Sequence, residues 1–236
     1  MKHLAVIPAR GGSKRIERKN IRNFKGVPII GRVIEQLIKS QKFDKVIVST
    51  DSDEIANISR KYGAEIPFKR PKNISDDHTS VVEVVRHSIN FFNDGNEKYD
   101  IIAMVYPTAA LIQTGDLDKA IKLIGKNDFA ISVSESPFPI ERSLLLNKDN
   151  GFIEMRDKLN FLRRSQDFPT SFYDAGQFIV GQNMSWITKL PMVEGRNIPI
   201  IIPRTRVQDI DTEEDWLEAE LKFTIMKKLD EKLGKR

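Results

Sequence analysis

The most informative shortage in this 236-residue chain is cysteine, of which it has none. Without cysteine there can be no disulfide, no thiolate nucleophile and no zinc–thiolate site. Histidine is also scarce: His3, His78 and His87 are the only three, and their spacing matches no metal-binding motif such as HExxH.

Long apolar runs are missing as well. The run Leu4–Ile7 is too short for a signal peptide or a membrane span, so we expect a cytoplasmic protein with no membrane partner. The formal net charge is +5, but the basic residues are not clustered with aromatic ones as nucleic-acid binding requires, so we expect no nucleic-acid partner. The densest basic cluster suits a polyphosphate instead: Arg10, Lys14, Arg15, Arg18, Lys19 and Arg22.

Strand-like and helix-like apolar patterns alternate along the chain. We expect strands over residues 4–8, 45–50, 65–68, 100–106, 129–133, 177–180 and 198–202. Helices are expected over residues 28–40, 51–63, 80–92, 114–124 and 212–232. This alternation predicts βαβ units and an α/β fold with a mainly parallel sheet.

The alternation stops at Pro137 and Pro139. The following stretch is polar, with the turn signal Lys148–Gly151 between two short apolar runs, which is typical of a projecting hairpin. No repeat, low-complexity tract or linker divides the chain. We therefore expect a single domain, 1–236, with an inserted segment at about 137–170.

A glycine-containing basic loop follows the first strand, with the sequence Pro8-Ala-Arg-Gly-Gly-Ser-Lys-Arg15 and then Arg18-Lys-Asn20. Adjacent glycines let backbone N–H groups approach phosphate oxygens, and Arg10, Lys14 and Lys19 can add charge-assisted hydrogen bonds. The loop also lies where open α/β sheets bind ligands. Neither the Walker A nor the GxGxxG spacing is present. The alternative is a solvated basic turn.

Two carboxylates, Asp209 and Asp211, follow the last expected strand. In an extended segment, residues two apart face the same side, so the pair could form an oxygen-ligand site for Mg²⁺, or for Mn²⁺. The alternative is that Asp211, three residues before Glu214, is the N-cap of the final helix.

Several motifs together resemble the acylneuraminate cytidylyltransferase, or CMP-sialic acid synthetase, family. They are PARGGSKRIERKNI (8–21), STDSDEIA (49–56), YGAEIPFKRP (62–71), YPTAALI (106–112), RSQDFP (164–169), DAGQF (174–178) and DIDTEEDW (209–216). They occur in order along nearly the whole chain. RSQDFP and DAGQF are most similar to the pseudaminic acid branch, whereas residues 108–111 and 177–180 depart from that branch at Ala110, Leu111, Ile179 and Val180.

This resemblance implies a three-layer Rossmann-like nucleotidyltransferase fold, CTP as substrate, and a homodimer in which residues 137–170 reach toward the partner. It assigns Ala9, Arg10, Gly11, Gly12, Ser13, Lys14, Lys19, Asn20, Arg70, Asp77, Ser80, Pro107 and Thr108 to the nucleotide, and Asp209 and Asp211 to the metal. Arg10, Lys14, Lys19, Asp209 and Asp211 are the expected catalytic residues. For Asp77 and Ser80, helix capping is an equally simple explanation.

The expected sugar-binding residues are Tyr106, Arg163, Arg164, Gln166, Asp174 and Gln177. Arginine forks match a sugar carboxylate, and aspartate or glutamine can bind hydroxyl and amide groups. Each has a plainer explanation: a core tyrosine, a solvated hairpin face, or a turn before a strand.

The expected reaction is attack by the anomeric hydroxyl of an acidic 2-keto sugar, pseudaminic acid, on the α-phosphorus of CTP, with release of pyrophosphate. Legionaminic, sialic and Kdo-type sugars remain alternatives. A non-catalytic nucleotide-binding protein is another, although binding alone needs no paired carboxylates.

Overall fold

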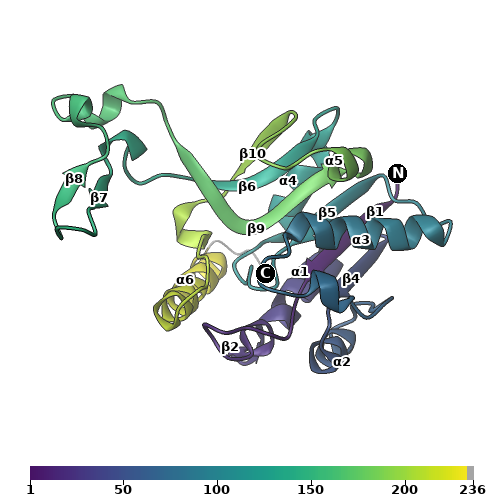
Figure 1. Cartoon of the computed structure of the whole chain (residues 1–236). Coiled ribbons are helices and arrows are strands. Elements are labelled where there is room, and N and C mark those ends of the chain that lie inside the picture. The colour runs from purple at the N-terminus through teal and green to yellow at the C-terminus, as the bar shows by residue number, and fades with distance from the viewer. Residues whose placement is uncertain (233–236) are drawn as a thin grey trace.

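The computed structural model describes residues 1–232, and its centre is a six-stranded sheet (Figure 1). The sheet order is β10-β6-β9-β5-β1-β4, where the strands are β1 (His3–Pro8), β4 (Lys45–Ser49), β5 (Ile101–Val105), β6 (Phe129–Glu135), β9 (Phe172–Gln182) and β10 (Asn197–Ile201). Only β9 runs antiparallel to its neighbours, β5 and β6. The expected α/β fold with a mainly parallel sheet is confirmed.

Helices cover both faces of this sheet. They are α1 (Ile29–Ser40), α2 (Asp53–Lys61), α3 (Val81–Asp94), α4 (Thr114–Ile124), α5 (Asn183–Thr188) and α6 (Glu213–Lys232). Alternating side chains of β1 separate the two cores: Ala5 and Ile7 pack in the cluster that includes α1 and α4, and Leu4 and Val6 in the cluster that includes α3 and Trp186 of α5. Within residues 1–232, no helix combines the length and apolar character needed to cross a bilayer.

Short elements complete the chain. The small strands are β2 (Asn23–Phe24), β3 (Val27–Pro28), β7 (Leu144–Leu146) and β8 (Ile153–Met155). The 3₁₀ helices are η1 (Lys19–Ile21), η2 (Lys72–Ile74), η3 (Ile140–Arg142), η4 (Lys158–Asn160), η5 (Ser165–Asp167) and η6 (Arg204–Arg206).

One expected strand is wrong. Residues 65–68 form only a single bridge, between Glu65 and Ile47, because Pro67 has no N–H to continue a ladder. Another strand is longer than expected: β9 begins at Phe172 rather than near Gln177, since its first residues pair with the end of β6 beyond a register shift.

Residues 137–170, here called the arm, leave the sheet between β6 and β9 and project to one side of the molecule (Figure 1). The expected hairpin is present, with β7 paired to β8 across the turn that contains Gly151. Its apolar side chains are largely solvent-exposed, because no other part of residues 1–232 covers them: Phe138, Ile140, Leu144, Leu145, Leu146, Phe152, Ile153, Leu159, Phe161 and Leu162.

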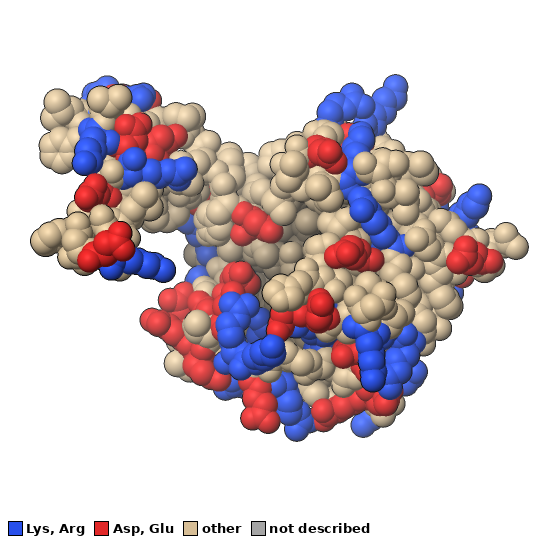
Figure 2. All heavy atoms as spheres, in the orientation of Figure 1, with Lys and Arg blue, Asp and Glu red and all other residues tan. Residues whose placement is uncertain are grey.

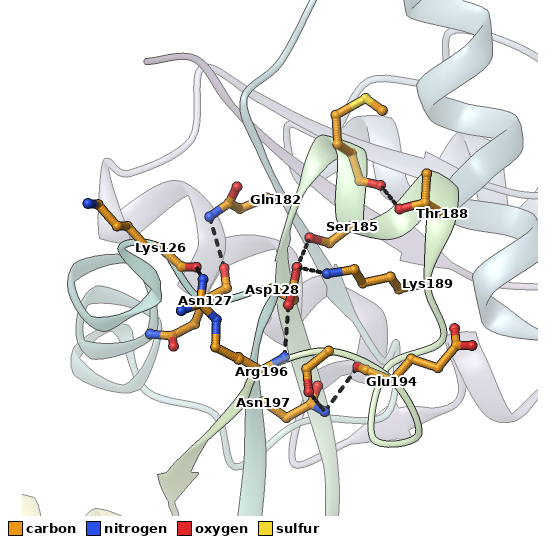
Figure 3. A network of polar contacts seen from close by, with 12 residues as sticks. Lys126, Asn127, Asp128, Gln182, Ser185, Thr188, Lys189, Glu194, Arg196 and Asn197 are labelled. Atoms are coloured by element: carbon orange, nitrogen blue, oxygen red, sulfur yellow. Dashed lines mark hydrogen bonds and ion pairs between the residues drawn. The ribbon is translucent and has the colours of Figure 1, made fainter.

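Asp128, the residue immediately before β6, connects α5 to the segment that leads into β10 (Figure 3). Its carboxylate accepts hydrogen bonds from Ser185 Oγ (2.8 Å), Lys189 Nζ (2.6 Å) and the Arg196 N–H (2.8 Å). These donors, Lys189 foremost, hold the pKa of Asp128 far below its usual range. Gly195 lies so close that a Cβ there would be 2.6 Å from a carboxylate oxygen, so this corner admits no larger residue.

We expect Asp128→Asn to lower the free energy of unfolding by about 1–3 kcal/mol, because the amide cannot accept all three bonds and leaves Lys189 without its counter-charge. Since the pKa is lowered, the contribution of Asp128 is present above the ordinary aspartate pKa and is lost only in strong acid. Urea denaturation at about pH 7 and about pH 5 should therefore show the same deficit. Asp128 precedes β6 and so lies at the edge of the sheet opposite the cleft described below, which means that activity should persist. If the variant is as stable as the wild type, the Asp128 network does not stabilise the fold.

Candidate active site

A cleft of about 420 Å³ lies at the edge where the parallel strands end, as expected for an open α/β sheet. The loop after β1, the end of β5 and the segment after β10 meet there. Twelve of the residues expected to bind substrate or metal line this one cleft: Arg10, Ser13, Lys14, Lys19, Asn20, Arg70, Asp77, Tyr106, Pro107, Thr108, Asp209 and Asp211. Figure 2 shows a hollow on this side, between the arm and the body.

The basic loop is anchored at its base. Ala9 is fully buried and its N–H bonds to the Ser49 carbonyl, while Asn20 Nδ2 donates to the Arg10 carbonyl at 3.0 Å. The Gly11 N–H donates to Asp51 Oδ1 at 2.9 Å, and a Cβ on Gly11 would sit 3.0 Å from the Cβ of Ser52. No atom lies within 4 Å of the position that a Cβ on Gly12 would take, so the space beside this residue is open.

Two loop cations share one carboxylate. Arg10 and Lys14 both form ion pairs with Asp77, the latter at 2.5 Å. Hydrogen bonds from Lys14 and then Arg10 lower the pKa of Asp77 to about 2, so it is ionised at neutral pH. At least a third of each of these three side chains is exposed, and exposed pairs of this kind are weak. A phosphate can therefore take the place of Asp77 on both cations.

The aspartate pair also faces the cleft. Asp211 pairs with Arg15 at 2.8 Å and with Lys19 at 3.3 Å, and Lys19 also donates to the Ile210 carbonyl at 2.6 Å. Asp209 is open to solvent on one side, yet desolvation and then the negative charge of Asp211 raise its pKa. Within residues 1–232, Asp211 therefore has two cationic partners, whereas Asp209 forms no ion pair.

The alternative in which Asp211 caps the last helix is wrong. Thr212 and Asp215 form that cap: the Asp215 N–H donates to Thr212 Oγ1 at 3.2 Å, and the Thr212 N–H donates to the Asp215 carboxylate at 2.7 Å. The Asp211 carboxylate consequently remains available to the cleft.

Arg70 lies deep in the cleft and is only 5% exposed. Its Nε and one terminal nitrogen have no hydrogen-bond partner within residues 1–232. Burial lowers the pKa of Arg70, an effect that nearby Asp51 partly offsets and Arg10 reinforces. A buried donor without an acceptor is costly, so Arg70 is well suited to bind an electronegative ligand atom.

Ser80, by contrast, caps a helix. It forms a capping box with Glu83 at the start of α3, which is the alternative explanation given above for this residue.

The expected sugar residues are divided between three places. Tyr106 lines the cleft, and burial, then Asp174 and Asp209, raise its pKa to about 12. Asp174 is exposed and accepts from the Gly176 N–H at 2.9 Å. Gln177 is 2% exposed, and its amide donates to the Arg206 carbonyl.

The other three residues lie on the arm and do not line the cleft of their own chain: Arg163, Arg164 and Gln166. Arg163 stacks 4.3 Å from the Phe168 ring, and Arg164 pairs with Asp167 at 3.0 Å. All of the sugar contacts therefore remain predictions.

The departures from the pseudaminic acid branch do not reach the cleft. Ala110 and Leu111 are buried in the cluster with Trp216, and Ile179 and Val180 are buried in the main cores on either face of the sheet. These four side chains therefore belong to the packed cores and not to the cleft lining.

A family model described as cytidylyltransferase matches residues 4–192, which include the basic loop and most of the sheet. The chain belongs to the cytidylyltransferase family. This confirms the resemblance drawn from the motifs.

Individual relatives agree with this membership. The chain is 38% identical over 227 residues to the pseudaminic acid cytidylyltransferase of Campylobacter jejuni subsp. jejuni serotype O:2, covering 95% of this chain and 97% of that protein. It is 26% identical to the N-acylneuraminate cytidylyltransferase of Escherichia coli O18:K1:H7, covering 96% of this chain and 52% of that protein. Among solved structures, a CMP:2-keto-3-deoxy-manno-octonic acid synthetase complexed with CTP matches with a TM-score of 0.70 at 15% identity, covering 96% of this chain and all of the other, which shows the shared fold.

This cytidylyltransferase also has a larger cavity, of about 700 Å³, between α1, the start of α4 and α6. None of the expected site residues lines it, and its cations are matched by Glu35, Asp230 and Glu231. The smaller cleft at the strand ends holds the loop, the aspartates and Arg70, so we assign the active site there.

Sequence reasoning missed two residues that organise this site. Asp51 holds the Gly11 N–H, and Arg15 pairs with Asp211. Asp51 could have been found, because it directly follows β4 at the edge where ligands bind. Arg15 belongs to the basic cluster, but its contact with a residue 196 positions along the chain left no local signal.

Proposed function

We propose that this cytidylyltransferase transfers CMP from CTP to the anomeric hydroxyl of pseudaminic acid, giving the CMP-sugar and pyrophosphate. The observation that carries the proposal is the meeting of the basic loop, Arg70 and the aspartate pair in one cleft. The choice of sugar is supported by the relatives: the Campylobacter jejuni protein and a two-function Helicobacter pylori protein, 32% identical over 213 residues, are both named pseudaminic acid cytidylyltransferases. The chain spans 40% of the Helicobacter pylori protein. Because CTP is a cytoplasmic metabolite, we place the reaction in the cytoplasm.

The proposed reaction is an in-line substitution. The anomeric oxygen forms a bond to the α-phosphorus while the bond between that phosphorus and the bridging oxygen breaks, and pyrophosphate leaves with the electron pair. The hydroxyl proton passes to solvent or to a carboxylate of the cleft. Arg10 and Lys14 bind the phosphates and oppose the negative charge that develops on them, and Gly12, which has open space beside it, adds its one backbone N–H donor.

The aspartate pair fits a hard divalent cation, because its donors are carboxylate oxygens, and a cation there would offset both the burial and the Asp211 charge that raise the pKa of Asp209. We propose that Asp209 and Asp211 hold Mg²⁺, with Mn²⁺ as a substitute. When bound, such an ion would neutralise phosphate charge and orient the triphosphate. Lys19 and Arg15 hold Asp211 in position within the cleft.

The decisive assay combines the protein, CTP and Mg²⁺ with pseudaminic, legionaminic, sialic or Kdo acid, and follows each CMP-sugar by mass. We expect the highest kcat/KM with pseudaminic acid. Faster turnover of another sugar would reassign the substrate, and CTP binding without turnover of any 2-keto sugar would leave a non-catalytic nucleotide-binding protein.

We also propose that the chain is one domain that forms a homodimer through the arm. The support is the exposure of the arm's apolar side chains, including Leu144 (60%), Leu146 (63%) and Phe161 (66%). Contiguous apolar surface of this kind in a soluble protein marks a protein–protein contact.

Such a dimer would explain why the arm arginines lie away from the cleft of their own chain. Arg163 and Arg164 do not line the cleft of their own chain, yet they lie on the segment proposed to reach the partner. We propose that they bind the sugar carboxylate in the partner's cleft, because arginine forks match carboxylates.

Complementation between two inactive variants tests this arrangement. In a mixed dimer of Arg164→Ala and Asp211→Ala chains, one cleft would combine an intact Asp211 with an intact Arg164 from the other chain. Random pairing of equal amounts should therefore restore about a quarter of wild-type activity, because half the dimers are mixed and each has one good site. If Arg164 acts within its own chain, co-refolded mixtures stay inactive.

A further inference from the structure

The last helix carries two apolar surfaces. One is buried: Trp216, Ala219 and Phe223 pack in the cluster with Phe24. The other, here called the α6 stripe, is 48–64% exposed and consists of Leu217, Leu221, Ile225 and Leu229. Residues four apart lie on one face of a helix, so these four side chains form a continuous apolar surface about 18 Å long. Nothing in residues 1–232 covers it, and the nucleotide cleft does not use it.

The arm has a matching surface. In the β7–β8 hairpin, Leu144 lies opposite Met155 and Leu146 opposite Ile153, and opposed residues share a face. One side of the hairpin is therefore wholly apolar. Two strands of three residues cover only about 10 Å by 10 Å, however, roughly 100 Å² in projection. A stable interface needs about 800 Å² from each partner, so contact between two hairpin faces alone is far too small.

The additional surface must lie on the same side of the molecule as the arm. In a two-fold dimer both protomers contribute the same patch, so the arm and the surface that receives it are parts of one continuous region. Figure 1 shows α6 and the arm on the same side of the sheet, and Figure 2 shows the hollow that separates them.

A cavity beside the α6 stripe supports this assignment. Ile225 and Leu229, together with Thr205 and Arg206, line a hollow of about 160 Å³. That volume suits one apolar side chain, and the arm offers Leu159 and Leu162, which are 90% and 89% exposed.

We infer that the α6 stripe of each protomer is the docking surface for the arm of its partner. This inference rests on the proposed homodimer and adds a contact between the arm and α6 to the contact between the two hairpins. Each arm then contacts the partner's last helix.

Photo-crosslinking tests the inference cleanly because the chain has no natural cysteine. The single variant Leu221→Cys, labelled with benzophenone maleimide and mixed with ¹⁵N-labelled unmodified chain, should crosslink on irradiation to peptides from residues 137–170 of the ¹⁵N chain. Leu123→Cys is the matched control: it is 48% exposed near the end of α4, shortly before β6 begins and so at the edge of the sheet away from the arm, and should yield no such link.

Sedimentation of the unmodified protein separates the two ways of failing. A monomer would refute the proposed dimer and the inference together. A dimer whose Leu221→Cys crosslinks never include the arm would overturn the inference alone. As a second measurement, Leu221→Glu should raise the dimer dissociation constant at least about tenfold. Leu221 is 64% exposed, so we expect the variant to fold normally. An unchanged dissociation constant would also overturn the inference.

Discussion

Replacing Asp209 by asparagine should lower kcat by about a hundredfold to a thousandfold, the usual loss when one electrostatic stabiliser of a transition state is removed. The substitution keeps the shape of the side chain but removes the charge that would hold Mg²⁺. Pyrophosphate release at saturating CTP and sugar measures the effect. Activity within a few-fold of wild type would exclude Asp209 as a metal ligand.

The same substitution should leave the fold at least as stable. Burial and Asp211 raise the pKa of Asp209, so the native state disfavours its ionised form. At neutral pH the charge therefore opposes folding, and asparagine removes that cost; the gain disappears as the pH falls and Asp209 becomes protonated. Because Asp209 is partly exposed, we expect a small gain in urea denaturation. Asp128→Asn is the matched control with the opposite pattern, less stable but active.

Replacing Arg70 by methionine should weaken CTP binding by about 10- to 150-fold, the equivalent of one hydrogen bond from a charged group at 1.5–3 kcal/mol. Isothermal titration calorimetry with CTP measures this loss. The free energy of unfolding should stay the same or rise, because the change removes a buried guanidinium that has two nitrogens without acceptors.

Arg86 provides the control for Arg70. Its Nε donates to the Trp186 carbonyl at 2.7 Å and a terminal nitrogen to the Lys189 carbonyl at 3.2 Å, so its donors are satisfied inside the fold. Arg86→Met should therefore destabilise the protein and leave CTP affinity unchanged. If both arginine variants lose stability and neither loses affinity, Arg70 is a structural residue.

How much the sequence could predict depended on the range of each interaction. The parallel strands, the hairpin and the basic loop follow from local patterns such as the alternation in β1 and the turn at Gly151. The orientation of β9 could not be predicted, because an antiparallel strand that follows a long insertion has the same apolar pattern as a parallel one. Pro67, which cannot donate to a ladder, was a local signal against a strand at residues 65–68, and it proved more informative than the apolar residues around it.

The same distinction holds in the site. The motifs identified most of the cleft lining, including Arg70 and the aspartate pair. Whether Asp211 or Thr212 caps α6 could not be decided from sequence, because both residue types favour that position; the geometry assigned the cap to Thr212. The arm arginines were assigned to the sugar because arginine forks match a carboxylate, and the fold of one chain holds them away from the cleft.

The ion pairs of Asp77 with Arg10 and Lys14 have a consequence for turnover. In the proposed reaction Arg10 and Lys14 bind the phosphates of CTP, so pyrophosphate would have to leave two bare cations. Asp77, with a pKa of about 2, is ionised at neutral pH and would return to these cations as the product leaves. The carboxylate would thus compete with the departing anion, and the weakness of an exposed ion pair would let the next CTP displace it in turn.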